Sequence, residues 1–275
     1  MGILDALSRI LATSGVQVDV MGFIVVFGLA FTRIVTAVNL APFFGGSVPA
    51  RVKVGLAVLI VAILFPQVAP PPQARNVQII AFIGLLAKEA MVGVTIGMVA
   101  QFIFYAIQMA GTIMDTQRGM NQLTFFAPQL PGHTSSLGQF KFQAAIALFF
   151  TMDGHLFFID GIARSFAPIP VMAFPQFHAG LEGVINQIIR LSADALVIGV
   201  KLAAPVLVAL FLIDAAFGAL GKVAGQINVH NESQPVKSLV GLVVFLFAVA
   251  FLMEQLRGHF LVMLQNIREI TLGIA

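Results

Sequence analysis

The mostly apolar run from Val77 to Met114 constrains this chain more than any other feature. It holds 38 residues, and as a helix it would extend roughly 57 Å at about 1.5 Å per residue. The hydrocarbon core of a bilayer is only about 30 Å thick. Within the run, Ala90–Met114 is long and free of both charge and proline. The run therefore predicts a long helix that is not a simple single crossing.

The composition indicates a membrane protein. The mean hydropathy is +0.99, and 10% of the residues are charged, whereas soluble domains average about 25%. The absence of cysteine excludes a disulfide framework and a thiolate metal site. A net charge of +3 is too small and too dispersed to suggest nucleic acid as a partner. Since no polar linker divides the chain, we expect one all-α, polytopic integral membrane unit over residues 1–275.

Six apolar segments are expected to form membrane-type helices. They are Val20–Phe44, Val54–Phe65, Val77–Met114, Phe140–Ile159, Ala195–Phe217 and Leu239–Met253. The second has 12 residues, too few for a span of about 20, and Pro66 ends it because proline breaks a helix. If each segment crosses once, Lys and Arg divide six against six between the two sides. The positive-inside rule then gives no orientation, so we infer that several helices face protein instead of lipid.

Other stretches complete the expected organisation. The amphipathic residues Met1–Gly15 predict an uncleaved leading helix, and Leu181–Ala193 predicts a more polar helix of its own. The pairs Gly93/Gly97, Ala106/Ala110 and Gly221/Gly225 have the small-residue spacing that lets helix backbones approach closely.

Five charged residues lie inside the apolar segments and would be costly if they faced lipid. They are Arg33, Lys88, Glu89, Lys201 and Asp214. Lys88 and Glu89 are adjacent and are not expected to pair across one helix face. Lys201 and Asp214 are 13 positions apart, roughly 220° around an ideal helix, and are not expected to pair either. Buried ion pairs between helices, contacts between subunits and a direct role in ion conduction all remain open.

The segment Asp115–Gly138 is rich in glycine, proline and polar residues, although apolar helices flank it. Lipid cannot satisfy the hydrogen-bonding groups of irregular backbone, so such a segment survives at membrane depth only inside protein or beside a water-filled passage. It is therefore a candidate gate. The alternative is an ordinary surface connection, since loops normally run over protein surfaces.

Sites for catalysis or cofactors are not expected. The five histidines are scattered and none has a ligand-like neighbour three or four positions on. Gly221-Lys222 lacks the upstream glycine spacing and the following Ser or Thr of a phosphate loop, and no G-x-S-x-G elbow is present. Asp153-Gly154-His155 fits either a proton relay or, more simply, a turn at a helix end. No metal, no cofactor and no enzymatic activity are expected.

Several motifs, taken in order, resemble those of the flagellar FliR family and of its virulence counterpart, the type III secretion T subunit. Together they cover nearly the whole chain. They are PFFGGSVPARVKVGLA (Pro42–Ala57), KEAMVGVTIG (Lys88–Gly97), AGTIMDTQRG (Ala110–Gly119), LGQF (Leu137–Phe140), DGH (Asp153–His155), APVL (Ala204–Leu207), INV (Ile227–Val229) and PVKSLVGL (Pro235–Leu242). Arg118 resembles the secretion branch and DGH the flagellar one, and His230–Gln234 is more polar than the family pattern.

The resemblance implies a non-enzymatic subunit of the protein export gate in a flagellar or injectisome basal body of the bacterial inner membrane. It implies assembly with P-type and Q-type subunits, a B-type switch subunit at the cytoplasmic mouth, and unfolded secreted proteins as cargo. It also implies that Asp115–Pro131 forms a channel plug. Within this loop we expect Phe125, Phe126 and Pro128 to occlude the channel. Gly119 would be a flexible point and Arg118 an anchor that bonds nearby carbonyls.

Two rival functions are kept. Interrupted helices and buried charges also occur in small-solute transporters, although these would predict an internal repeat, and no fixed-period repeat is visible in the chain. The second rival is a purely structural membrane scaffold with no contact to a channel.

Overall fold

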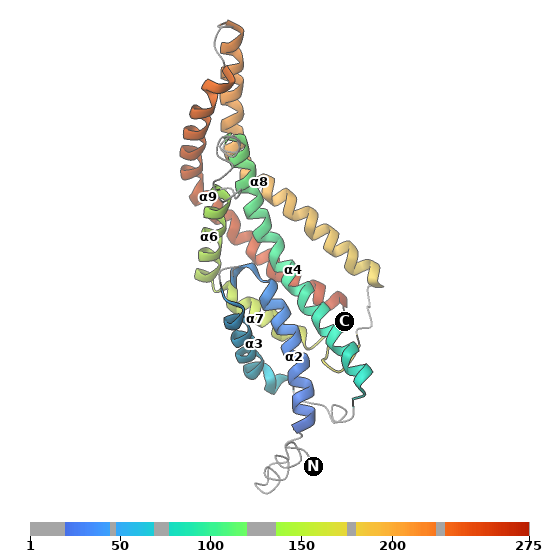
Figure 1. Cartoon of the computed structure of the whole chain (residues 1–275). Helices are drawn as coiled ribbons and strands as arrows, with labels where there is room; N and C mark the ends of the chain where they lie inside the picture. The colour runs from blue at the N-terminus through green and yellow to red at the C-terminus, as the bar shows by residue number, and fades with distance from the viewer. Residues whose placement is uncertain are drawn as a thin grey trace. The chain divides into compact units, whose positions relative to one another are not determined.

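The computed structural model describes residues 20–44, 48–68, 77–119, 136–174, 180–223 and 229–274, and these contain helices and no strand (Figure 1). The α-helices are α2 (Val20–Leu40), α3 (Ala50–Leu64), α4 (Ile79–Gln117), α6 (Ser136–Thr151), α7 (Gly154–Ser165), α8 (Gly180–Val223) and α9 (Val229–Ile274). Two short 3-10 helices, η1 (Pro42–Phe44) and η2 (Phe65–Gln67), follow α2 and α3. The all-α prediction is confirmed.

Four of the described helical segments are long and apolar enough to cross a membrane. They are Met21–Leu40, Ile79–Gln117, Ile185–Val223 and Glu232–Val249. The broken pair α6 and α7 brings the number to five if it is counted as one span. Helix α3, with 15 residues, is not among them, as its short apolar run predicted. The prediction of a polytopic membrane protein is confirmed.

Several predicted boundaries were wrong. Leu181–Ala193 is not a separate helix, because it continues into the apolar segment as α8. The segment Phe140–Ile159 is broken between α6 and α7, where Asp153 takes a φ of 56°. Short polar residues such as Asp tolerate this left-handed conformation better than most. The proposed loop also begins later than expected, since Asp115–Gln117 forms the last turn of α4. The leading residues Met1–Gly15 lie outside the described part.

The chain divides into two compact units, and three long helices run from one into the other. Unit 1 comprises Met1–Gln101, His155–Ile188 and Leu264–Ala275. Unit 2 comprises Phe102–Gly154 and Ile189–Met263.

In unit 1, the first part of α4 packs closely on α2 through two glycines. A Cβ atom at Gly93 would overlap Thr36 and the carbonyl oxygen of Arg33, and one at Gly97 would lie 2.6 Å from the Cβ of Leu40. The Gln101 Nε2 donates a 2.8 Å hydrogen bond to the Leu40 carbonyl and so satisfies the C-terminal end of α2. The close packing predicted from G-x-x-x-G is confirmed for this pair.

In unit 2, the core is aromatic. Phe104 on α4, Phe149 on α6 and Phe260 on α9 are buried, with ring centroids 5.2–5.7 Å apart. Helix α8 approaches α4 at Gly199, where a Cβ atom would lie 3.1 Å from the Ala106 carbonyl oxygen. Small residues on both helices therefore set the spacing in this unit too.

Candidate functional site

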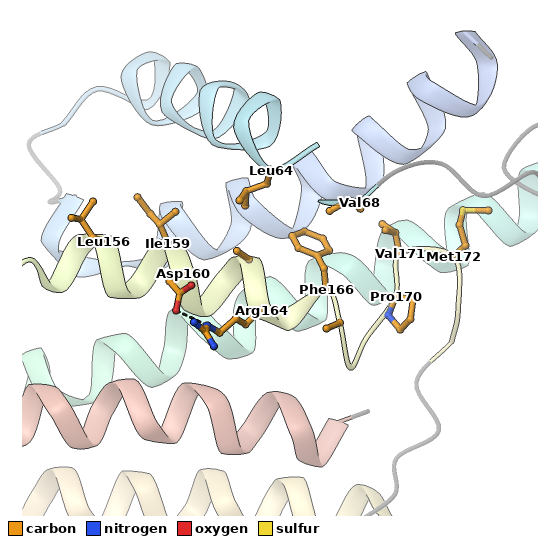
Figure 2. A pocket seen from close by; sticks show the side chains of 12 residues that line it. Leu64, Val68, Leu156, Ile159, Asp160, Arg164, Phe166, Pro170, Val171 and Met172 are labelled. Carbon is orange, nitrogen blue, oxygen red and sulfur yellow. Dashed lines mark hydrogen bonds and ion pairs between the residues drawn. The ribbon is translucent and has the colours of Figure 1, made fainter. Parts of the chain in front are cut away.

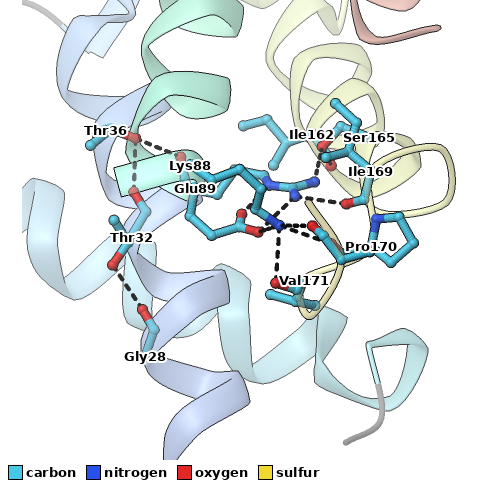
Figure 3. A network of polar contacts seen from close by, with 12 residues as sticks. Gly28, Thr32, Thr36, Lys88, Glu89, Ile162, Ser165, Ile169, Pro170 and Val171 are labelled. Atoms are coloured by element: carbon cyan, nitrogen blue, oxygen red, sulfur yellow. Dashed lines mark hydrogen bonds and ion pairs between the residues drawn. The ribbon is translucent and has the colours of Figure 1, made fainter. Parts of the chain in front are cut away.

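Three of the predicted charged residues meet in unit 1, and we call Arg33, Lys88 and Glu89 the charge cluster (Figure 3). Arg33 on α2 donates two hydrogen bonds to Glu89 on α4, from Nε to Oε2 at 2.5 Å and from Nη2 to Oε1 at 3.0 Å. Both side chains are fully buried. Two parallel bonds of this kind combine charge attraction with a fixed geometry. The pair therefore locks α2 to α4 at one register.

Lys88 joins the same carboxylate, with its Nζ 2.5 Å from Glu89 Oε1. The expectation that these neighbours cannot pair was wrong. Their Cα–Cβ bonds diverge by about 100° around the helix, but the four-carbon lysine stem is flexible enough to bring its ammonium back to the carboxylate. The ammonium also contacts the carbonyl oxygens of Pro170 at 2.8 Å and of Val171 and Ala173 at 3.0 Å each.

The charge cluster thereby holds the irregular segment that follows α7. Arg33 donates to the Ser165 hydroxyl at 3.0 Å and to the Ile169 carbonyl at 2.7 Å, and its guanidinium lies 4.2 Å from the Phe166 ring centroid. The Ile169 and Val171 carbonyls lie beyond the end of α7 and are buried, so the two cations satisfy groups that burial would otherwise penalise. Of the alternatives left open by the sequence, a buried ion pair between helices describes Arg33 and Glu89 in this structure.

The remaining two predicted charges lie in unit 2. Asp214 on α8 pairs with Lys237 on α9, and the Asp214 side chain is 44% exposed. Lys201 is exposed on α8 and forms no ion pair with another described residue. The pKa of His259 is lowered by burial first and then by the nearby charge of Lys201. As expected, Lys201 and Asp214 do not pair with each other.

The end of α4 is fixed by a second polar group in unit 2, which we call the exit anchor: Asp115, Arg118, Gly119 and Ser238. Arg118 donates from Nη1 to Asp115 Oδ1 at 3.1 Å. It also donates to the Ser238 carbonyl on α9, from Nη2 at 2.9 Å and from Nε at 3.2 Å. Asp115 and Arg118 are both buried. The arginine therefore ties the last turn of α4 to α9.

Glycine is required twice around this arginine. Gly119 has a φ of 77°, and its N–H donates to the Thr116 carbonyl at 3.1 Å. This is a common end of an α-helix, in which the residue after the last turn adopts the left-handed conformation. A Cβ atom there would also overlap the side-chain oxygen of Gln234. On α9, a Cβ at Gly241 would lie 2.8 Å from Arg118 Cγ. Backbone freedom at Gly119 and close approach at Gly241 together make room for the exit anchor.

Sequence reasoning missed four residues that contribute to these contacts: Asp115, Lys141, Lys237 and Ser238. Lys141 is buried in unit 2, 3.5 Å from the Leu202 carbonyl oxygen and 5.8 Å from the Phe245 ring centroid. Lys141 is the second residue of the apolar segment Phe140–Ile159. A cation at such a position is a sequence signal that could have predicted its burial. Of the predicted plug residues, Phe125, Phe126 and Pro128 lie outside the described residues.

The described residues hold no cluster of three or more His, Cys, Asp or Glu side chains that could bind a metal ion. Asp153 lies in the turn between α6 and α7, and Gly154 is the first residue of α7. The polar groups of both units are thus arranged to join helices and irregular segments, and those described here form no recognisable catalytic set.

Comparison with known proteins matches the sequence to one family. Residues 24–263 match the family model of the bacterial export proteins, family 1. The flagellar biosynthetic protein FliR of Bacillus subtilis is 30% identical over 249 residues, covering 89% of this chain and 93% of that protein. FliR of Pectobacterium carotovorum is 32% identical, covering 82% and 84%. The Yop proteins translocation protein T of Yersinia pestis is 29% identical, covering 76% and 79%. The chain therefore belongs to family 1 of the bacterial export proteins.

Proposed function

We propose that this chain is a non-enzymatic subunit of a type III protein export gate, in which it helps to form and seal the channel for unfolded secreted proteins. The carrying observation is the family match over residues 24–263, which spans parts of both units. Relatives named for flagellar biosynthesis and for Yop protein translocation support both branches of this system. The two units act as one export-gate domain in the bacterial inner membrane.

The proposed seal is the segment that follows the exit anchor. A segment that blocks a passage needs a fixed point of attachment, which we call its root. If the root moved, the segment would move out of the opening. Arg118 supplies that root through its bonds to Ser238 and Asp115, and Gly119 sets the direction in which the chain leaves α4. Phe125, Phe126 and Pro128 follow within ten residues. Bulky apolar side chains can exclude water, and with it ions, from a constriction.

The proposed partners are the P-type and Q-type export subunits, with a B-type switch subunit at the cytoplasmic mouth. Large apolar side chains that stand open on the described helices support this assembly. Ile63 on α3, Phe211 on α8 and Phe247 on α9 are 74%, 69% and 85% exposed. Lys201 adds an exposed cation within a candidate span, where a lipid-facing charge would be costly. Packing against neighbouring subunits would cover the apolar groups and offer Lys201 a carboxylate or a wet cavity.

The experiment that tests the seal changes Phe125 and Phe126 together to alanine. We expect the complex to assemble normally and to leak ions, because the water-excluding side chains are gone while the exit anchor is intact. Ion conductance of the purified complex in planar bilayers measures the leak, and co-purification of the partners measures assembly. Phe157→Ala, at an exposed position on α7, is the control and should leave conductance unchanged.

An assembled double variant with the conductance of the unchanged complex would place the seal in another segment or subunit. It would favour the scaffold alternative for this chain. Selective passage of a small solute by the isolated chain would favour the transporter alternative instead.

A further inference from the structure

A cavity of about 790 Å³ opens in unit 1 between the end of α3, helix α7 and the segment after α7 (Figure 2). Its lining is apolar except for one acidic and one basic side chain. Leu64, Val68, Ile159 and Phe166 contribute apolar lining, and Asp160 and Arg164 are the two charged residues. The volume falls within the range of about 300–1,000 Å³ that is usual for small-molecule sites.

The charge cluster holds one wall of this cavity in place. The Phe166 ring contacts the Arg33 guanidinium, and the carbonyl oxygens of the lining residues Pro170 and Val171 accept from Lys88. Moving this wall inward would break bonds to buried cations, which is costly. The cavity is therefore built by the fold and does not depend on an occupant to hold it open.

The polar part of the lining is an ion pair one helical turn long. Arg164 Nε lies 2.6 Å from Asp160 Oδ2, and the two side chains are 73% and 51% exposed. Among the described residues, the remaining Arg164 nitrogens and Asp160 Oδ1 form no further bond. The pair therefore presents hydrogen-bond donors and an acceptor side by side at the open side of the cavity.

The surface around the cavity is apolar. Leu59 and Ile63 on α3 are 62% and 74% exposed, and Leu156 and Phe157 on α7 are 56% and 53% exposed. A ligand that satisfies both parts must carry a long apolar portion and a compact group with one positive and one negative charge. A peptide helix would cover the apolar surface, but it is too wide, at about 10–12 Å across with its side chains, to enter a cavity of this volume as a whole.

We propose that the cavity binds a phospholipid with a zwitterionic, ammonium-bearing headgroup. Its phosphate would face Arg164, its ammonium would face Asp160, and an acyl chain would lie along Leu64, Ile159 and Phe166. An anionic headgroup without the ammonium would place its negative charge near the Asp160 carboxylate with no positive group of its own to face it. The proposal goes beyond the export function, which requires no lipid site.

The test uses the complex assembled with its partners, transferred to nanodiscs of phosphatidylethanolamine and phosphatidylglycerol in equal parts, and native mass spectrometry of the retained lipid. The expected result is retained phosphatidylethanolamine that is lost in Ile159→Trp, which fills the cavity. Asp160→Asn should abolish the preference for that headgroup over phosphatidylglycerol, because the ammonium loses its carboxylate. Arg164→Gln should lower the retained amount of both lipids, because both carry the phosphate. Two controls in unit 2 should retain the lipid: Leu261→Trp at an exposed position on α9, and Arg257→Gln in the exposed Glu254–Arg257 pair.

Two results would overturn the proposal: no headgroup preference in the unchanged complex, or equal lipid retention in Arg164→Gln and Arg257→Gln. A photo-reactive amino acid at position 159 provides a further arm that does not depend on Ile159→Trp assembling. Cross-linking to lipid supports the proposal, and cross-linking to a partner subunit contradicts it. Because ion conductance is measured separately, failure of the lipid site is distinguishable from failure of the gate.

Discussion

The charge cluster of unit 1 and the exit anchor of unit 2 contain the same kind of contact but have different roles. In both, an arginine on one helix reaches a backbone carbonyl far along the sequence, from Arg33 to Ile169 and from Arg118 to Ser238. The cluster is fully enclosed at Arg33 and Glu89, and both its cations also bond carbonyls of the segment after α7. The exit anchor closes a helix end and stands directly before the proposed seal.

The charge cluster and the exit anchor differ in the free energy that is needed to open them. Opening the charge cluster would strand two cations and a carboxylate in an apolar interior, which is among the most costly changes a fold can undergo. Opening the exit anchor would expose one helix terminus and break one buried ion pair, Asp115–Arg118, which is one cation fewer than in the charge cluster. We infer that the cluster is permanent structure, whereas the exit anchor is the part of the molecule where a modest change in free energy could alter the gate.

The largest effect is expected for Glu89→Gln. The substitution leaves Arg33 and Lys88 buried without a counter-charge, and breaking a buried pair in this way costs about 3–5 kcal/mol. The yield of assembled complex and its thermal unfolding midpoint in detergent should both fall sharply. Glu182→Gln, at an exposed position of the same unit, is the matched control. Equal yields for the two variants would show that the cluster is not what holds unit 1 together.

An intermediate effect is expected for Gly119→Ala. An alanine at a φ of 77° is strained by about 1–2 kcal/mol, and its methyl group would also displace Gln234. The complex should still assemble but should conduct ions more readily, because the root of the seal is displaced. Conductance in planar bilayers is the measurement.

Two further variants sharpen that comparison. Gly218→Ala should change nothing, since a Cβ atom there meets no other atom within 4 Å. Adding Gln234→Ala to Gly119→Ala removes the overlap and leaves the backbone strain. A partial fall in ion conductance in the double variant would therefore show how much of the leak comes from each cause. If Gly119→Ala conducts like Gly218→Ala, the exit anchor does not control the gate.

The smallest effect is expected for Asp214→Asn. The Asp214 carboxylate is 44% exposed, whereas its partner Lys237 is only 10% exposed. Because water reaches the carboxylate, we expect this pair to contribute about 1 kcal/mol, at the upper end of the range for surface pairs. The thermal unfolding midpoint of the complex should therefore shift by much less than in Glu89→Gln. A loss of stability as large as that of Glu89→Gln would mean that the pair is enclosed by a partner subunit in the assembly, and the contrast between the two units would then disappear.

The sequence was sufficient for properties that depend on one segment at a time. Apolar runs predicted the helices and their membrane character, and Gly93 with Gly97 predicted a close helix contact, because periodicity and side-chain size act locally. Helix boundaries were less reliable. Leu181–Ala193 was separated from α8 because its polarity changes, although backbone hydrogen bonding continues through a change of polarity.

Only the tertiary structure decided the partners of the charged residues. Arg33, Glu89 and Ile169 are far apart in sequence, and no spacing along one helix predicts that they meet. The same is true of Arg118 with Ser238 and of Asp214 with Lys237. Sequence established that a charge in an apolar segment needs compensation, since burial of an unpaired charge is prohibitive. Which group compensates it depends on distances between segments, and those distances are fixed only when the helices pack.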